Sequence, residues 1–332
     1  MQGISAINLA PNTCLWAIGS RSIEKASECA SDNGFRPTVK VYGSYDAVLD
    51  DTNVDAVYVP LLTSLHLTWD VLTVEKKKHL EAIIKACESN GVHYMDATMW
   101  MHQPRTAQMR DFISHRRFGP PQSGILISRL FFFSGRLRAD ASRILEHHRR
   151  IFTYEASPEF LMNSIQVKPD LDALGALGNA GWYSIWAILW ATDYELPKRV
   201  TALQKPEFNE AGCSFLTNLN LDIAALGAQG NLRVHDLSYH FKRTRPRSKW
   251  FLHPGSWNLP GIGPALGDHK VKMDLPQEGL MVREFARLVV GIKGSGSELE
   301  KKRPTISWKT QLVVHAVNAS IERKFEPVEL GN

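Results

Sequence analysis

Short apolar runs alternate with helical patterns through the first hundred residues, and this alternation limits the folds open to the chain. "CLWAIGS" (14–20) reads as a strand, and "SIEKASECASDNG" (22–34) reads as a helix with Ser22 as its N-cap and Gly34 at its end. "KVYGSYDAVLDD" (40–51) gives a short strand and a helix. Repeated units of this kind form a parallel sheet that binds ligands at the carboxyl ends of its strands.

The alternation continues toward residue 100 but lacks one strand. "VDAVYVP" (54–60) and "VHYMDATMW" (92–100) are predicted strands, and "EAIIKACESNG" (81–91) is a predicted helix. Between 74 and 91 the chain passes from a basic run directly into this helix, although parallel strands require a crossover that returns to the sheet. The sequence therefore predicts an α/β Rossmann-type N-terminal domain that is incomplete.

The second half of the chain has a different pattern. Strand-like alternation occurs in residues 151–160, 213–237 and 270–276, and helical patterns occur in residues 173–192, 278–293 and 307–325. These features predict an α+β domain with a mainly antiparallel open sheet. The expected domains are therefore a truncated dinucleotide-binding domain (1–120), an Arg-rich insertion or loop (121–150) and a C-terminal substrate or oligomerisation domain (151–332).

Composition excludes several classes of function. The four cysteines form no C-x-x-C pair, and the 12 histidines include no H-E-x-x-H, so we expect neither a disulfide framework nor a metal site. The chain contains no G-x-S-x-G sequence, the motif that would indicate a hydrolase. The net charge of +5 is modest for 332 residues, and residues 131–150 show no basic and aromatic interleaving, so nucleic acid is not an expected partner. We expect a cytoplasmic protein with no membrane segment.

Five sequence stretches follow one another as they do in a known family. They are "GSRSIEKA", "VDAVYVPLLTSLH", "ACESNGVHYMDATMWMHQPR", "DLDALGALGNAGWYSIWA" and "QEGLMVREFARLV". Together they resemble the glucose-fructose oxidoreductase / inositol dehydrogenase / MocA (GFO/IDH/MocA) family, in particular plant-type members similar to dihydrodiol and NADP-dependent xylose dehydrogenases. The resemblance implies NAD(P)-dependent hydride transfer to or from a sugar-like or cyclic diol or polyol substrate. It also implies a homo-oligomer formed through the C-terminal sheet.

The chain departs from this family at two places. The first strand with its G-x-G-x-x-G turn is absent before "ISAINLAPN", and "GIGPALG" (261–267) reads as a loop because its spacing is wrong. The Glu-Lys-Pro segment expected after His79 is also absent. We therefore expect impaired activity. The alternative is a non-catalytic remnant that retains the C-terminal sheet as an oligomerisation surface.

Two residues occupy the catalytic positions that the resemblance implies. Asn179 and Tyr183 stand four residues apart, where the family has an acid and a His or Tyr, and such residues share one face of a regular helix. A phenol can act as a general acid when a cation lowers its pKa. Tyr183 could equally be a core aromatic of "GWYSIWAILW".

Cofactor contacts are expected after three of the predicted strands. Arg21, between Ser20 and Ser22, stands where an acidic residue would select NAD, so NADP is the preferred cofactor; the alternative is an exposed arginine before a serine cap. Further candidates follow the strands at 54–60 and 92–100: Pro60, Leu61, Thr63, His66, Asp96, Trp100 and Arg105. Alternatively, His66 begins a helix and Trp100 is a core aromatic.

Overall fold

The computed structural model describes residues 6–60, 79–114, 168, 174, 177–202, 223–227, 230–234, 247–254 and 268–330. The chain divides into two compact units, each built from separate segments. Unit 1 consists of Met1–Pro60, Met99–Gln103 and Met273–Glu300, and unit 2 consists of Leu61–Thr98, Pro104–Lys272 and Lys301–Asn332. The domains expected from the sequence (1–120, 121–150 and 151–332) stay a prediction.

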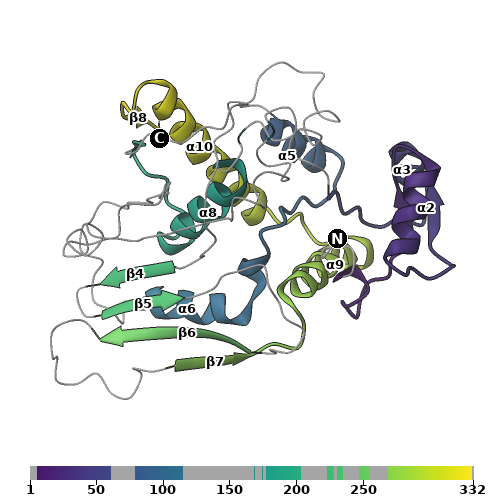
Figure 1. The fold of residues 1–332 in the computed structure, drawn as a ribbon, viewed down its shortest axis with the longest axis horizontal. Coiled ribbons are helices and arrows are strands. Elements are labelled where there is room, and N and C mark those ends of the chain that lie inside the picture. The colour runs from purple at the N-terminus through teal and green to yellow at the C-terminus, as the bar shows by residue number, and fades with distance from the viewer. Residues whose placement is uncertain are drawn as a thin grey trace. The chain divides into compact units, whose positions relative to one another are not determined.

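Unit 1 contains the first strand–helix units of the predicted sheet. Strands β1 (Ala17–Gly19) and β2 (Lys40–Tyr42) pair in parallel, with Ile18 opposite Val41. Helix α2 (Ile23–Asp32) connects them, and the short helix α3 (Tyr45–Leu49) follows β2 (Figure 1). The predicted alternation of strands and helices is confirmed over residues 17–49.

The ends of α2 follow from its capping residues. The Ser22 hydroxyl accepts a hydrogen bond from the Lys25 backbone N–H at 3.3 Å, as an N-cap does. At the other end Asn33 is the C-cap, and Gly34 follows it with φ +60°. The Gly34 N–H bonds to the Ser31 carbonyl at 2.9 Å and the Phe35 N–H to the Ala30 carbonyl at 3.0 Å, which is a Schellman motif.

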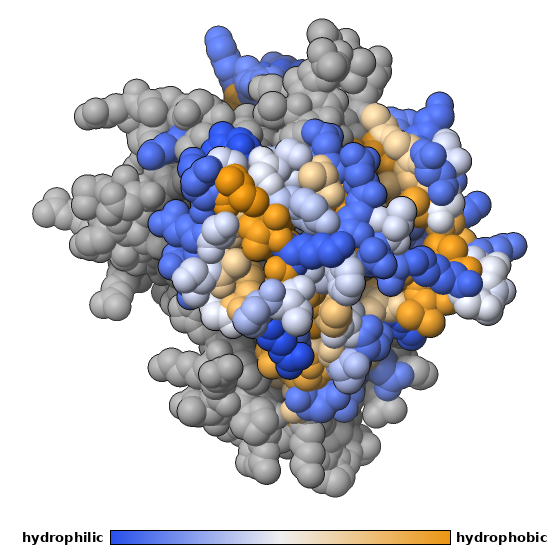
Figure 2. Space-filling model, turned by 90° about the vertical axis from the view of Figure 1, so that its right-hand side faces the viewer, coloured by the Kyte–Doolittle hydropathy of each residue, from blue (hydrophilic) through white to orange (hydrophobic). Residues whose placement is uncertain are grey.

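Two predicted strands are not strands in the structure. Residues 54–60 have no strand assignment, and Val57, Tyr58 and Val59 are 43%, 37% and 46% exposed. Residues 92–98 have no strand assignment either. A β-strand requires a hydrogen-bonded neighbour, and among the described strands β1 pairs only with β2. Figure 2 shows hydrophobic residues at the surface on the side where α2 and α3 lie in Figure 1.

Unit 1 also contains a 3-10 turn, η1 (Met99–His102), and the long helix α9 (Gln277–Ser295), which contact each other. The Gln103 amide donates to Gln277 Oε1 at 2.5 Å, and both side chains are buried. The Asn12 amide donates to the Arg283 carbonyl at 3.1 Å. Lys293 and Asp55 form an exposed ion pair. Segments that are distant in sequence therefore hold α9 within this unit.

Helices form most of the described core of unit 2. They are α5 (His79–Ser89), α6 (Pro104–Ser114), α8 (Trp182–Ala191) and α10 (Lys302–Glu322). A π-helical turn, η3 (Leu177–Gly181), leads directly into α8. Helix α8 packs against α10 (Figure 1) through a cluster of buried apolar residues: Leu177, Ile185, Leu189, Val313 and Val314. The helices predicted at 173–192, 278–293 and 307–325 are confirmed in their described parts.

Unit 2 also contains the predicted antiparallel sheet. Its order is β4-β5-β6-β7, formed by Ile223–Gly227, Gly230–Val234, Arg247–Pro254 and Asp268–Lys272. Helix α6 contacts β6 and β7 (Figure 1). Sequence analysis missed β6, whose "RSKWFLHP" has three consecutive apolar residues rather than alternation. A second, two-stranded sheet pairs β3 (Arg199–Val200) with β8 (Val328–Glu329).

Several predictions lie outside the described residues, namely the strand at 151–160, the Arg-rich segment 131–150 and the loop 261–267. Within the described parts of the chain, no helix is long and apolar enough to cross a membrane.

Candidate functional site

The turns after β1 and β2 lie against each other in unit 1. A Cβ atom on Gly19 would lie 2.4 Å from Val48 Cγ2, and one on Gly43 would lie 3.1 Å from the Ile23 backbone nitrogen. The Ser20 N–H donates to the Tyr42 carbonyl at 3.2 Å, which extends the parallel pairing past the strand ends. The two glycines therefore allow the carboxyl ends of β1 and β2 to approach each other closely.

The N-terminus of α2 opens at this edge of the sheet. Backbone N–H groups in the first turn of a helix carry partial positive charge and favour anions. Ser22 caps one of these groups through Lys25. Hydrogen bonds from its own backbone and from the Ser22 hydroxyl lower the pKa of the nearby Glu24 carboxyl. The Glu24 carboxylate is therefore hydrogen-bonded to donors of its own helix turn.

Arg21 is the cation at this edge. Its side chain is exposed, and within the described residues no acidic side chain forms an ion pair with it. An exposed guanidinium beside a helix N-terminus is suited to a phosphate group, because it donates two parallel hydrogen bonds. The turn Ser20–Ser22 can therefore accept a phosphate group, and its predicted contact with the 2′-phosphate of NADP stays a prediction.

The other predicted cofactor contacts are spread over both units. In unit 1, Pro60 is exposed and Trp100 in η1 is only 2% exposed. In unit 2, Arg105 in α6 is 5% exposed. The burial of Trp100 fits the alternative of a core aromatic. The remaining candidates Leu61, Thr63 and His66 lie outside the described residues, and the cofactor role of this whole set stays a prediction.

The two predicted catalytic residues flank a change of helix type in unit 2. Asn179 lies in the π-helical turn η3, and Tyr183 lies in the first turn of α8. The π-helical turn runs directly into α8, so the structure keeps both residues on one continuous helical segment. Their catalytic role stays a prediction.

The structure does bring Tyr183 next to the predicted residue Asp96. The Tyr183 hydroxyl donates to the Ala97 carbonyl at 3.5 Å. Asp96 Oδ1 accepts the Thr98 N–H at 2.8 Å, and Asp96 Oδ2 accepts a hydrogen bond from the Ser307 hydroxyl. Thr98 and Ser307 were missed by sequence analysis, because nothing in the local pattern links two small polar residues so far apart in the chain.

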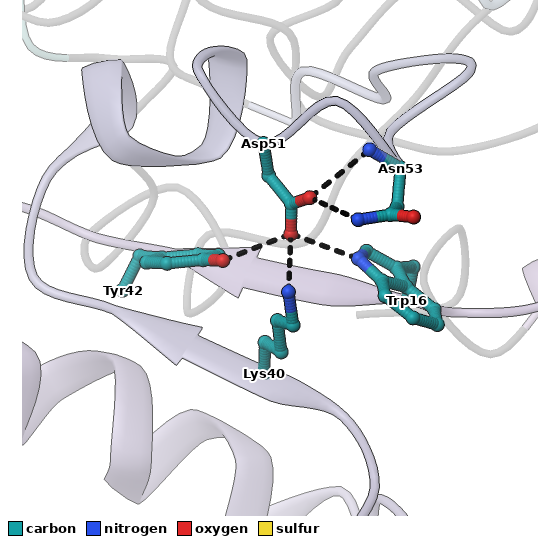
Figure 3. Close-up of polar contacts among 5 residues, drawn as sticks. All are labelled: Trp16, Lys40, Tyr42, Asp51 and Asn53. Atoms are coloured by element: carbon teal, nitrogen blue, oxygen red, sulfur yellow. Dashed lines mark hydrogen bonds and ion pairs between the residues drawn. The ribbon is translucent and has the colours of Figure 1, made fainter.

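A second polar cluster surrounds Asp51 beside the β1–β2 pair (Figure 3). Asp51 Oδ2 accepts hydrogen bonds from Trp16 Nε1 at 2.9 Å, Lys40 Nζ at 3.0 Å and the Tyr42 hydroxyl at 2.9 Å. Asp51 Oδ1 accepts the Asn53 N–H at 3.0 Å and side-chain amide at 2.9 Å. Trp16 precedes β1, Lys40 begins β2 and Tyr42 ends β2, so this carboxylate links the start of β1 to both ends of β2.

The donors around Asp51 explain its electrostatics. The Asn53 backbone N–H, the Asn53 amide, Trp16 and Lys40, in this order, lower the pKa of the Asp51 carboxyl. Its side chain is only 5% exposed. An ionised acceptor that binds five donors within one unit holds the strand ends together. It is a structural residue that the sequence analysis did not identify.

No family model matches the chain. The chain is 29% identical over 184 residues to D-xylose 1-dehydrogenase (NADP(+)) 2 of Haloferax volcanii, and the match covers 52% of this chain and 47% of that protein. It is 23% identical over 310 residues to dTDP-3,4-didehydro-2,6-dideoxy-alpha-D-glucose 3-reductase of Actinomadura kijaniata, which covers 87% of this chain and 83% of that protein. The chain thus spans about half the length of the xylose dehydrogenase.

The fold is also found in solved structures. KijD10, a 3-ketoreductase from Actinomadura kijaniata in complex with NADP and TDP-benzene, superposes with a TM-score of 0.58 at 20% identity, over 96% of this chain and 92% of that chain. NADP, the cofactor expected from Arg21, is the cofactor named for both the dehydrogenase and this ketoreductase. The chain therefore has the Rossmann-type fold of NAD(P)-binding oxidoreductases.

Proposed function

We propose that this chain binds NADP in preference to NAD and belongs to the sugar-type oxidoreductases of the GFO/IDH/MocA family. The observation that carries the proposal is Arg21, which is exposed in the turn after β1 and forms no ion pair with an acidic side chain among the described residues. The two relatives whose names include NADP support it. Arg21 binds the 2′-phosphate, and the N-terminus of α2 contributes its partial positive charge.

The substrate class follows from the same relatives. Their names include D-xylose and a dTDP-linked deoxyglucose, so a sugar-like or cyclic polyol is the proposed substrate here. When bound, NADPH would supply the hydride to the substrate, or NADP+ would accept it. Within the protein, the Tyr183 phenol donates a proton to the reacting substrate oxygen or accepts one from it.

Turnover is expected to be low compared with members of the family that have the Glu-Lys-Pro segment. This chain has no Glu-Lys-Pro after His79, so it lacks the family lysine that helps to move the proton. The absence of strands at 54–60 and 92–98 supports the same expectation. Inserting a short strand that ends in Glu-Lys-Pro after His79 should raise NADP-dependent turnover with a panel of sugars and diols.

Calorimetric titration with NADP and NAD tests the cofactor preference. A charged hydrogen bond contributes about 1.5–3 kcal/mol, so NADP should bind about 10- to 150-fold more tightly than NAD. Arg21→Ala should remove most of this preference. Arg36→Ala, at an exposed arginine beyond the far end of α2, is the matched control and should retain it. Equal affinity of the unmodified chain for the two cofactors would refute the proposal.

The second candidate function is a non-catalytic protein that oligomerises through the antiparallel sheet of unit 2. The exposed apolar residues Val57, Tyr58 and Val59 favour the non-catalytic part of this candidate, because an intact dinucleotide-binding sheet would bury this segment. If millimolar NADP causes no heat of binding while the protein elutes as a dimer or larger species, this candidate is supported and the oxidoreductase proposal fails.

A further inference from the structure

The turn formed by Asp96, Ala97 and Thr98 is bonded to two helices of unit 2. On one side, Asp96 accepts a hydrogen bond from the hydroxyl of Ser307, a residue of α10 with 0% exposure. On the other side, Thr98 Oγ1 accepts the Trp182 indole N–H of α8 at 3.1 Å. A third bond, from the Thr98 N–H to Asp96 Oδ1 at 2.8 Å, closes the turn itself.

These bonds join elements that also pack against each other. Helix α8 contacts α10, and Trp182 packs on their shared apolar cluster. Thr98 is 1% exposed, so its hydroxyl cannot exchange Trp182 for water without opening the core. The turn is therefore held in one position with respect to the start of α8.

Tyr183 directly follows Trp182 and contacts the middle of the same turn. Its hydroxyl is 3.5 Å from the Ala97 carbonyl oxygen, which is long for a hydrogen bond between oxygen atoms. The phenol is only partly buried. Catalytic hydrogen bonds are often long in the absence of substrate and tighten in the complex, so this length is compatible with a catalytic phenol.

We propose that Asp96 and Thr98 are positioning residues, which hold the Ala97 carbonyl where it sets the resting orientation of the Tyr183 hydroxyl. Asp96 acts through Ser307, and Thr98 acts through Trp182. This inference rests on the proposed function, in which Tyr183 moves the proton. It gives Asp96 a task other than the cofactor contact expected from the sequence.

The NMR signal of Tyr183 Cζ tests the inference in the full chain labelled with [13Cζ]tyrosine, and Tyr183→Phe assigns the signal. Thr98→Val removes the acceptor for Trp182, and Ser307→Ala removes the donor to Asp96. Both variants should shift the Tyr183 signal. Thr98→Ser keeps the hydroxyl and should restore the signal of the unmodified protein, which also guards against failure of the valine variant to fold.

The matched control is Thr310→Val on α10. Thr310 has 0% exposure and donates to the Ile306 carbonyl at 2.9 Å, away from the turn, so its loss should leave the Tyr183 signal in place. The inference is overturned if Thr98→Val and Ser307→Ala leave the signal unchanged, or if Thr310→Val shifts it equally. Calorimetry with NADP separates the two proposals: no binding by the unmodified chain refutes the proposed function, while the NMR result still decides whether the turn positions Tyr183.

Discussion

Gly19 lies so close to Val48 that a methyl group on it would come within 2.4 Å of Val48 Cγ2 and 3.1 Å of the Ser44 carbonyl oxygen. The first turn of the candidate cofactor site therefore depends on the absence of a side chain at this position. Neither residue is predicted from the sequence to contact the other. Their proximity arises because α3 packs against β1.

Gly19→Ala should destabilise unit 1 by about 1–3 kcal/mol, the usual cost of adding a methylene group to a close-packed site. The double variant with Val48→Ala should recover much of this loss, because the added methyl then occupies the space vacated by the valine. Urea unfolding measures both free energies. Gly294→Ala in α9 is the control, since nothing lies within 4 Å of its Cβ position and alanine favours a helix. If Gly19→Ala is as stable as this control, Gly19 and Val48 are not in the close contact described here.

Asp51→Ala should lower the midpoint of thermal unfolding by several degrees at pH 7, because Trp16, Lys40 and Tyr42 lose their common acceptor. The pKa of Asp51 is lowered in the folded protein. Its contribution is therefore present above the usual carboxyl pKa of about 4 and is lost as the pH falls, when the unfolded chain takes up the proton first.

Unfolding at pH 7 and pH 3 checks this sign. The difference between the unmodified protein and Asp51→Ala should shrink at the lower pH. Asp50→Ala, at the exposed neighbouring residue, should show little difference at either pH. A stability difference between the two proteins that grows on acidification would contradict the conclusion that the ionised Asp51 carboxylate accepts these hydrogen bonds.

Lys324→Gly should stabilise the C-terminus of α10 by about 0.5–1 kcal/mol. Lys324 has φ 57°, a left-handed conformation that costs a residue with a Cβ about 1–2 kcal/mol. Glycine removes this cost, but part of the gain is offset because glycine loses more conformational entropy on folding. Gly34→Ala tests the converse at the same position after α2, where φ is +60°. It should destabilise by about 1 kcal/mol. Equal thermal midpoints for the two variants would contradict the argument.

Tyr194→Phe should make the protein more resistant to alkali. Burial, followed by the charges of Arg110 and Asp193, which act in opposite directions, raises the pKa of Tyr194 to about 12. The unfolded tyrosine ionises near pH 10, so the unmodified protein loses stability between about pH 10 and pH 12, and the phenylalanine variant lacks this loss.

The comparison requires unfolding curves from pH 8 to pH 12. Below pH 10 the two proteins should have the same pH dependence, because Tyr194 is un-ionised in both the folded and the unfolded chain. Their stabilities should also be similar, because the phenylalanine ring can keep the edge-on contact with Trp186 at 5.4 Å and the position beneath Arg110 at 5.0 Å. Tyr194→Leu removes these ring contacts and should be less stable at every pH. Parallel curves for the unmodified protein and Tyr194→Phe would show that Tyr194 ionises at its ordinary pKa.

The sequence by itself determined the elements whose causes are local. Helix α2 begins at its Ser22 cap and ends before Gly34, and α5 ends before Gly91 at φ +66° with the Val92 N–H bonded to the Cys87 carbonyl at 2.9 Å. Such caps need only residues within one or two turns. The exposure of Arg21 could be predicted for the same reason, because a short turn between a strand and a helix N-cap cannot bury a long charged side chain.

Only the tertiary structure decided the features that need a partner from elsewhere in the chain. Residues 54–60 and 92–98 have strand-forming sequences, yet no neighbouring strand accepts their backbone hydrogen bonds within the described residues, so they form no strand. The five donors of Asp51, and the bonds from Ser307 to Asp96 and from Trp182 to Thr98, join residues that no local pattern relates. Capping and periodicity act over a few residues, whereas sheet pairing and buried polar bonds require the whole fold to bring donor and acceptor together.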